Sequence, residues 1–165
     1  MRICLALLLL FGTAAETYAQ GTIFLVRHAE RADSGTMAGT TMATDPDLSE
    51  AGRARAESLA MMLKGAGIKA IYTTEYQRTR QTAAPLAKAL GIEVTVVPSR
   101  DMKGLVEKLK AAASPVLVVG HSNTVGETIA ALGISEPVKI GDADYDNLFI
   151  VSPGLKPTLV RLHYH

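Results

Sequence analysis

The stretch Phe24-Leu25-Val26-Arg27-His28-Ala29-Glu30-Arg31 joins a run of apolar residues to an adjacent arginine and histidine. The apolar run predicts a buried strand, and the two cationic side chains follow at its carboxyl end. Open α/β sheets bind their ligands at that edge. A guanidinium offers a planar fork of donors that matches phosphate geometry, and an imidazole can act as a nucleophile or an acid–base group near neutral pH. The stretch therefore predicts an anion site, with phosphate chemistry as the first interpretation.

The composition fits one compact domain. The chain has 165 residues, of which 48% are hydrophobic and 20% are charged, which is enough for one substantial core. The formal net charge is +1, and this balance gives no support for binding to nucleic acid or to a membrane surface. A preference for anions must therefore be local to a site. The composition does not indicate an oligomeric state.

Residues 1–19 have the pattern of a secretory signal peptide: a positive start, an apolar segment over residues 3–11 and small residues that lead to Ala19. We expect cleavage after Ala19, with Ala15 as a second possible site. The mature domain would span residues 20–165, would be exported to the periplasm or the extracellular space, and would have no stable membrane association. The alternatives are an uncleaved anchor and a buried N-terminal helix.

The only cysteine, Cys4, lies within this leader. After cleavage the protein would contain no cysteine. This expectation excludes disulfides, thiolate nucleophiles and cysteine-based metal sites in the mature chain.

Short β-rich runs alternate with longer helical patterns along the mature chain. This alternation predicts an α/β fold, a three-layer α/β/α sandwich with a mostly parallel sheet. A short segment with two prolines and a glycine joins the last two strands, so we expect an antiparallel hairpin at one edge. The expected strands are 22–27, 70–73, 93–96, 115–120, 147–151 and 158–162, and the expected helices are 50–64, 75–90, 102–112 and 125–131.

A second candidate site lies in residues 71–83. Thr74 and Gln77 have the spacing of a capping box, so we expect a helix to begin here directly after a strand. Free amides and the positive end of the helix dipole favour an anion at its first turn, and Arg78 falls in or next to that turn. Arg80 faces a different direction. Either arginine alone is also typical of a solvated surface residue.

A third candidate follows another apolar strand, where Gly120 and His121 precede Ser122, Asn123 and Thr124. The glycine permits a tight turn and the close approach of a ligand, and one of the three polar residues is expected to cap the next helix. A single histidine after a strand is usually structural. Two histidines that each end a buried strand at the same sheet edge indicate a site.

A zinc site built from His28, His121 and a carboxylate is an alternative interpretation. Arg27 and Arg78 would place positive charge beside such a cation and oppose its binding. The same arginines favour a phosphoryl group, so the metal hypothesis is the weaker one.

Four short motifs stand in order along the chain. They are Arg-His-Ala-Glu at 27–30, Leu-Ser-Glu-Ala-Gly at 48–52, the segment 74–83 with its arginine and threonine, and Gly-His-Ser at 120–122. They resemble the Arg-His-Gly-Glu, Leu-Thr-x-x-Gly, Ser-x-x-x-Arg-Ala-x-x-Thr-Ala and Gly-His elements of the histidine phosphatase superfamily, the phosphoglycerate mutase-like group. The resemblance covers about residues 22–151 and is to a small, minimally decorated member.

The resemblance implies a phosphatase that hydrolyses a phosphomonoester or related phosphoryl group. His28 would be the nucleophile and would form a phosphohistidine that water hydrolyses. Arg27, Arg78 and His121 would bind the phosphoryl oxygens and stabilise their charge in the transition state, and Ser122 would help to bind the substrate. No metal or organic cofactor is needed. The substrate would be a phosphorylated small molecule or a phosphoprotein.

Two rival functions stay open. One is a phosphohistidine phosphatase that acts on proteins, which the small size suggests. The other is a non-catalytic phosphate-binding or interaction module that has kept the pocket. Export argues against a glycolytic mutase, because the substrates of such an enzyme are cytosolic.

The chain departs from the family pattern at several positions. Ala29 replaces the usual glycine and Thr79 the usual alanine, and both changes are modest in volume. Ser34 stands where mutases usually have an asparagine that contacts phosphate, which lowers the mutase interpretation. Glu30 either orients neighbours in the site or forms an exposed ion pair.

The general acid of the family has no direct counterpart in this chain. Many members carry a Glu or Asp in an insertion after the third strand, whereas this chain has only the short stretch 98–103. Asp101 is a candidate, followed by Glu75 and Glu107, although Asp101 can instead cap a helix. Without an acid, the preferred substrates would have good leaving groups, such as phosphohistidine or activated phosphoesters.

Overall fold

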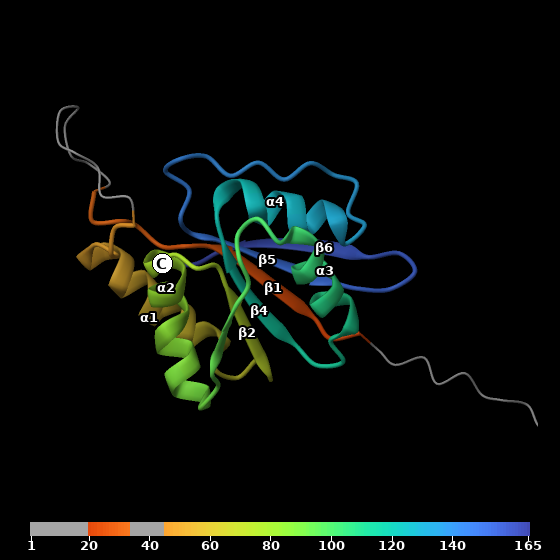
Figure 1. Ribbon diagram of the computed structural model, residues 1–165, viewed down its shortest axis with the longest axis horizontal. Coiled ribbons are helices and arrows are strands. Elements are labelled where there is room, and N and C mark those ends of the chain that lie inside the picture. The colour runs from red at the N-terminus through yellow and green to blue at the C-terminus, as the bar shows by residue number, and fades with distance from the viewer. Residues whose placement is uncertain (1–19, 34–44) are drawn as a thin grey trace, which may run out of the picture.

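A computed structural model describes residues 20–33 and 45–165 of the chain (Figure 1). The expected leader over residues 1–19, with Cys4, and the family departure at Ser34 lie outside these residues. In the part of the chain that the structure describes, no helix has both the length and the apolar character that a membrane crossing requires.

The described strands form one mixed sheet. They are β1 (Ile23–Arg27), β2 (Ala70–Thr73), β3 (Val94–Val96), β4 (Val116–Gly120), β5 (Asn147–Ser152) and β6 (Thr158–His163). Their order across the sheet is β3-β2-β4-β1-β5-β6. The first four pair in parallel, while β5 runs antiparallel to both β1 and β6. The predicted mostly parallel sheet with an antiparallel edge hairpin is confirmed.

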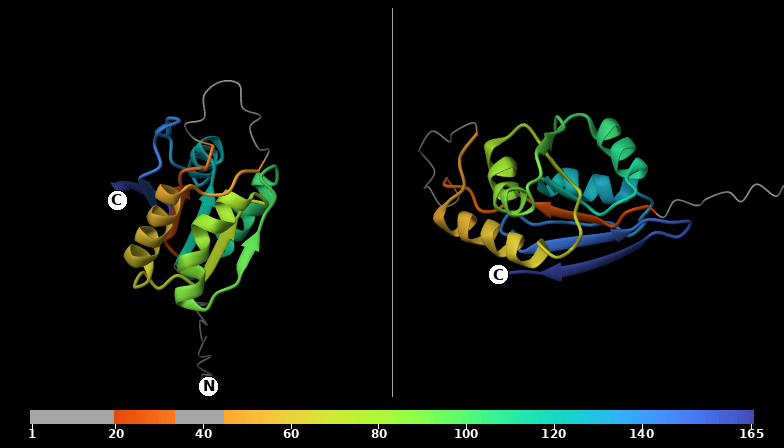
Figure 2. Two further views of the ribbon diagram at one scale, coloured as in Figure 1. Left: turned by 90° about the vertical axis from the view of Figure 1, so that its left-hand side faces the viewer. Right: turned by 90° about the horizontal axis from the view of Figure 1, so that it is seen from below.

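Helices cover both faces of the sheet (Figures 1 and 2). They are α1 (Glu50–Leu63) and α2 (Gln77–Leu90) on one face, and α3 (Met102–Ala111) and α4 (Ser122–Ala131) on the other. Side chains alternate between the faces along β1, so that Phe24 and Val26 pack in the core under α1 and α2 while Ile23 and Leu25 pack in the core under α3 and α4. The three-layer sandwich is thus built around two apolar cores.

Two helices begin at residues that the sequence did not predict. α2 starts at Gln77 with Tyr76 as its N-cap, and the side chain of Tyr76 makes no capping hydrogen bond. The expected capping box between Thr74 and Gln77 is therefore wrong. α4 starts at Ser122, earlier than expected, with His121 as its N-cap and the hydroxyl of Thr124 accepting the His121 amide hydrogen at 2.8 Å.

The register of the central strands sets the position of the site. In the β1–β4 pair Arg27 lies opposite Gly120, and in the β2–β4 pair Thr73 lies opposite Val119. His28 and His121 therefore leave two neighbouring parallel strands at the same level of the sheet. The carboxyl edge of the sheet brings together segments that are far apart in the sequence.

Candidate active site

His28 follows β1 directly and is buried, with 4% of its surface exposed. Its Nδ1 atom lies 2.8 Å from the carbonyl oxygen of Ala29. A carbonyl oxygen can only accept, so Nδ1 carries the proton and Nε2 holds the free lone pair. Burial lowers the pKa of His28 to about 3; the bond to Ala29 opposes this shift, and the charges of His121, Arg27 and Arg78 add to it. The imidazole is neutral at neutral pH and has one nucleophilic nitrogen.

Hydrogen bonds fix the backbone around His28. Its amide donates to the carbonyl of Gly120 at 2.9 Å. The amide of Ala29 donates to the hydroxyl of Thr82 at 2.9 Å, and this hydroxyl donates to the carbonyl of Arg78 at 2.7 Å. Helix α2 is thereby tied to the segment that carries the histidine.

His121 lies next to His28, with 5.4 Å between the ring centroids. Its Nε2 lies 3.0 Å from the hydroxyl of Thr74, and its Nδ1 lies 3.5 Å from Nη2 of Arg78. A guanidinium carries only hydrogens, so Nδ1 faces it with a lone pair and the Nε2 hydrogen points to Thr74. Burial, together with the charge of Arg78, lowers the pKa of His121 to about 4. Both imidazoles are neutral before an anion arrives.

Arg27 ends β1 and is buried, with 8% of its surface exposed. Its Nη1 atom donates to the backbone carbonyls of Gly141 at 2.8 Å and Asp142 at 3.0 Å. These bonds hold the guanidinium against the segment between α4 and β5. Its Nε atom is buried and has no hydrogen-bond partner among the described residues.

Arg78 is the second residue of α2 and reaches the imidazoles, whereas Arg80 does not. The amide of Gln77 at the start of α2 donates to the carboxylate of Asp45 at 2.9 Å, and this carboxylate lies 3.6 Å from Nη1 of Arg78. An anionic group thus occupies the first turn of the helix, as the sequence predicted for an anion. Arg80 is exposed and donates to the side chain of Gln77 at 3.2 Å.

Two tyrosines border the site, and the sequence analysis identified neither. The ring centroid of Tyr76 lies 5.2 Å from that of His121, and the ring centroid of Tyr145 lies 6.1 Å from that of His28. Tyr76 stands two residues before Arg78, so its position in the motif was a usable signal. Tyr145 lies between α4 and β5 in a stretch without a motif, and only the fold brings it to the site.

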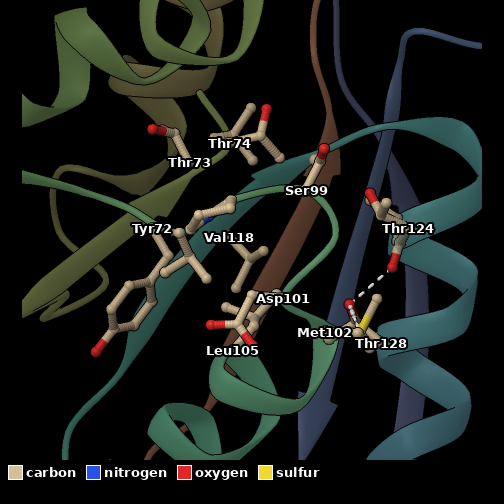
Figure 3. Close-up of a pocket in the computed structure, with 15 residues that line it drawn as sticks. Tyr72, Thr73, Thr74, Ser99, Asp101, Met102, Leu105, Val118, Thr124 and Thr128 are labelled. Carbon is tan, nitrogen blue, oxygen red and sulfur yellow. Dashed lines mark hydrogen bonds between the residues drawn. The ribbon is translucent and has the colours of Figure 1, made fainter. Parts of the chain in front are cut away.

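The structure engages the carboxylates of Asp101 and Glu107 with other groups. The carboxylate of Asp101 accepts the amide hydrogen of Gly104 at 2.9 Å and caps α3, which confirms the alternative role expected for it. Asp101 also lines a small pocket of about 20 Å³. Ser99 lines the same pocket (Figure 3). Glu107 is exposed and lies 4.0 Å from Nζ of Lys103.

Glu75 lies closer to the site but is ionised. Its carboxylate accepts the amide hydrogen of Ser99 at 2.7 Å and the hydroxyl hydrogen of Ser99 at 2.9 Å. Partial burial favours a higher pKa for Glu75, but hydrogen bonds from its own amide and from Ser99, with the nearby His121, lower the pKa overall. A carboxylate held in this way has no proton to donate at neutral pH.

Glu30 forms a structural ion pair that is partly buried rather than exposed. Its carboxylate accepts from Nη2 of Arg55 at 2.7 Å and from Nε at 2.9 Å. Arg55 also donates to the carbonyl of Tyr164 at 2.9 Å, so the pair ties the residue after β6 to α1. The backbone of Glu30 also explains why the second motif has a glycine at position 52. A Cβ atom there would overlap the carbonyl oxygen of Glu30.

Ser122 begins α4 beside His121. With Asn123 and Gly126 it lines a groove between α4 and residues 137–140. Within the described residues its side chain makes no hydrogen bond to the two histidines or the two arginines. The structure therefore brings together His28, Arg27, Arg78 and His121, and it places Ser122 at their border.

A search of the described ranges, 20–33 and 45–165, finds no cluster of three or more His, Cys, Asp or Glu side chains that could hold a metal ion. The two histidines instead share their surroundings with two arginines, whose charges lower the pKa of both rings. These charges favour an anion between the side chains.

Sequence comparison adds a family match. The family model of the histidine phosphatase superfamily (branch 1) matches residues 23–101. The chain is also 36% identical over 77 residues to the PE-PGRS family protein PE_PGRS11 of Mycobacterium tuberculosis. That match covers 46% of this chain and 13% of the relative, so the chain spans a small part of the relative's length.

Solved structures share the fold over most of the chain. The protein histidine phosphatase SixA, complexed with tungstate, aligns with a TM-score of 0.66 and 19% identity over 86% of this chain and 96% of that chain. A mycobacterial glucosyl-3-phosphoglycerate phosphatase with inorganic phosphate aligns with a TM-score of 0.65 and 18% identity over 85% and 95% of the two chains. Because both identities are below 20%, the structural similarity establishes the fold of this chain and nothing about its activity.

Proposed function

Because the chain belongs to the histidine phosphatase superfamily, we propose that it is a phosphatase that works through a covalent phosphohistidine on His28. The observation that carries this proposal is the tautomer of His28. The Ala29 carbonyl holds the proton on Nδ1, and the lowered pKa keeps Nε2 unprotonated. A neutral imidazole nitrogen beside two guanidinium groups is suited to attack a phosphorus atom.

The proposed reaction has two displacements. In the first, the Nε2 lone pair of His28 forms a P–N bond while the bond from phosphorus to the leaving-group oxygen breaks. In the second, water attacks phosphorus, the P–N bond breaks, and inorganic phosphate leaves with His28 neutral again. The sum is the hydrolysis of one phosphoryl group by one water molecule, and no cofactor takes part.

Arg27, Arg78 and His121 would stabilise the phosphoryl oxygens during both steps. Phosphoryl transfer depends mainly on positioning and on electrostatic stabilisation of the equatorial oxygens. The charges of both arginines act on both imidazoles, which supports a common anion position. The tungstate and the phosphate named for the two solved relatives are tetrahedral oxyanions, and they support the same proposal.

The proposed substrates have leaving groups that depart without a strong acid. Asp101 is engaged as a helix cap and Glu75 is ionised, so neither is suited to protonate the leaving group. Aryl phosphates fit this requirement, and so does a phosphohistidine of a protein, whose imidazole takes its proton from water. Phosphorylated small molecules and phosphoproteins are therefore both proposed as substrate classes.

Turnover tests the proposal and separates it from a module that only binds phosphate. The purified protein is incubated with an aryl phosphate, with a chelator present, and compared with His28→Ala. We expect hydrolysis that survives the chelator and is absent from the variant. Tight binding of vanadate without any hydrolysis by the wild type would instead favour the binding module.

We also propose that the protein is exported, with residues 20–165 as the mature domain. The positive start, apolar segment and small residues of 1–19 support this proposal. Mass spectrometry of the protein recovered from its native cells is expected to find an N-terminus near Gln20. A native protein that still begins at Met1 would overturn this part of the proposal.

A further inference from the structure

Each arginine of the site lies over the ring of a tyrosine. The Cζ atom of Arg27 is 4.2 Å from the ring centroid of Tyr145, and the Cζ atom of Arg78 is 4.3 Å from that of Tyr76. Both distances are typical of cation–π contacts. The same pairing therefore occurs twice, once beside each of the two imidazoles.

The in-plane N–H groups of these arginines are incompletely used. The Nε atoms of Arg27 and Arg78 are buried and have no hydrogen-bond partner within the described ranges. Arg78 approaches His121 and Asp45 only at 3.5 and 3.6 Å, which is longer than a good hydrogen bond. A buried donor without an acceptor raises the free energy of the folded protein. An anion bound between the arginines would supply the missing acceptors, so both arginines have donors available for a ligand.

Arg55 shows the opposite arrangement. Its Nε and Nη2 donate to the carboxylate of Glu30 at 2.9 and 2.7 Å, and the ring centroid of Tyr164 lies 5.8 Å from its Cζ. A carboxylate takes up the in-plane donors of a guanidinium, whereas an aromatic face contacts its π surface and leaves those donors open. The partner of an arginine thus decides whether it can still bind an anion.

We propose that Tyr76 and Tyr145 are positioning residues that hold Arg78 and Arg27 by their faces and keep the in-plane donors open for the phosphoryl oxygens. This inference rests on the proposed function, because it assigns the two tyrosines to the same phosphoryl site. It predicts that the tyrosine rings matter for anion affinity and that their hydroxyl groups do not.

Equilibrium binding of orthovanadate to the full chain tests this inference apart from turnover. Tyr76→Leu and Tyr145→Leu are each expected to weaken vanadate binding by about tenfold, since each removes one cation–π contact. Tyr76→Phe and Tyr145→Phe keep the ring and are expected to bind within about twofold of the wild type. Tyr72→Leu is the matched control, because Tyr72 is partly buried on β2 and carries no arginine over its ring in the described structure.

A second background shows whether Tyr76 acts through Arg78. Lysine has no planar guanidinium that could stack on a ring, and it has no Nε donor. In an Arg78→Lys protein, Tyr76→Leu is therefore expected to change vanadate affinity by less than about twofold. Circular dichroism of every variant confirms the native fold. A tenfold effect that persists in the Arg78→Lys background, or an equal loss in the Phe and Leu variants, would overturn the inference.

The two proposals fail in different ways. A wild type that hydrolyses neither aryl phosphates nor phosphohistidine, while the vanadate ratios come out as expected, would overturn the proposed function and support the positioning role. A wild type that hydrolyses aryl phosphates through His28, with vanadate affinity unchanged in both Leu variants, would overturn the positioning role alone.

Discussion

The Nδ1 atom of His28 lies 2.8 Å from the carbonyl oxygen of Ala29, and this contact decides which ring nitrogen is free to react. Because Nδ1 must donate to the carbonyl, Nε2 has the available lone pair. The amide of Ala29 is held in turn by the hydroxyl of Thr82. The orientation of the imidazole therefore depends on two neighbouring backbone groups and on α2.

The first prediction concerns the nitrogen that is phosphorylated. During turnover of an aryl phosphate, the phosphoryl group is expected on Nε2 of His28. An alkaline quench preserves the P–N bond, and phosphorus NMR of the denatured protein distinguishes the two ring isomers. His28→Ala is the control and is expected to carry no label. Phosphorus on Nδ1, or on another residue, would contradict the assigned tautomer.

The second prediction compares two arginines of α2. Arg78→Ala is expected to lower kcat/KM by about 100-fold or more, because it removes a charge that stabilises the phosphoryl oxygens. Arg80→Ala is expected to change kcat/KM by less than about twofold, since Arg80 is exposed and its side chain hydrogen-bonds to Gln77, at the surface of the helix. Steady-state kinetics on one aryl phosphate gives both ratios. Equal losses in the two variants would refute this assignment.

The third prediction concerns stability between pH 7 and pH 5. Burial lowers the pKa of His28 from 6.5 to about 3, so in this window the unfolded chain binds a proton that the folded protein does not. The free energy of unfolding should therefore fall as the pH falls, by up to about 2 kcal/mol from His28 alone. Urea unfolding at several pH values measures it.

His28→Gln is the control for this effect, because glutamine does not titrate. Its stability is expected to fall less between pH 7 and pH 5 than that of the wild type, and His121 accounts for part of the remaining fall. Identical pH dependence in the two proteins would show that His28 is not held neutral by burial.

The fourth prediction concerns the glycine of the second motif. Gly52→Ala is expected to lower the free energy of unfolding by about 1–3 kcal/mol, because the added Cβ atom would overlap the carbonyl oxygen of Glu30. Gly65→Ala is the matched control after α1, where a Cβ atom meets nothing within 4 Å. It is expected to stabilise the protein by up to about 1 kcal/mol. A Gly52→Ala protein as stable as the wild type would exclude the close contact.

The fifth prediction concerns the leaving group. Without a proton donor, kcat/KM should rise steeply as the leaving group becomes less basic, so aryl phosphates are expected to react much faster than alkyl phosphates. Glu75→Gln should leave the aryl-to-alkyl ratio unchanged, because the Glu75 carboxylate is ionised and bound to Ser99. A ratio that changes several-fold in this variant would identify Glu75 as the acid.

Much of the fold was predictable because periodicity is a local property. The apolar strands that end in Arg27 and in Gly120 were visible as uninterrupted runs, and both lie in the middle of the sheet. The start of α2 was not predictable in the same way. Thr74 has the sequence of a capping residue, but its hydroxyl is used by His121 and Thr79, and this competition exists only in the folded chain.

The same distinction between local pattern and tertiary contact separates the residues of the candidate site. Arg27, His28, Arg78 and His121 were found because each stands directly at the end of a strand or at the start of a helix. Tyr145 was not found, since its contact with Arg27 depends on the path of an irregular segment between α4 and β5. No periodic pattern in the sequence encodes such a path.

The sequence by itself determined the alternation of strands and helices and the residue types at the carboxyl edge of the sheet, because both depend on near neighbours in the chain. The tertiary structure decided which ring nitrogen of His28 is free, which arginine reaches the imidazoles, and which aromatic rings hold the arginines. The free nitrogen of His28 depends on the backbone at Ala29, which Thr82 of α2 holds in place. The other two properties depend on distances between segments that are far apart in sequence, and burial lowers the pKa of both histidines. Only the packed sheet and its helices set those distances.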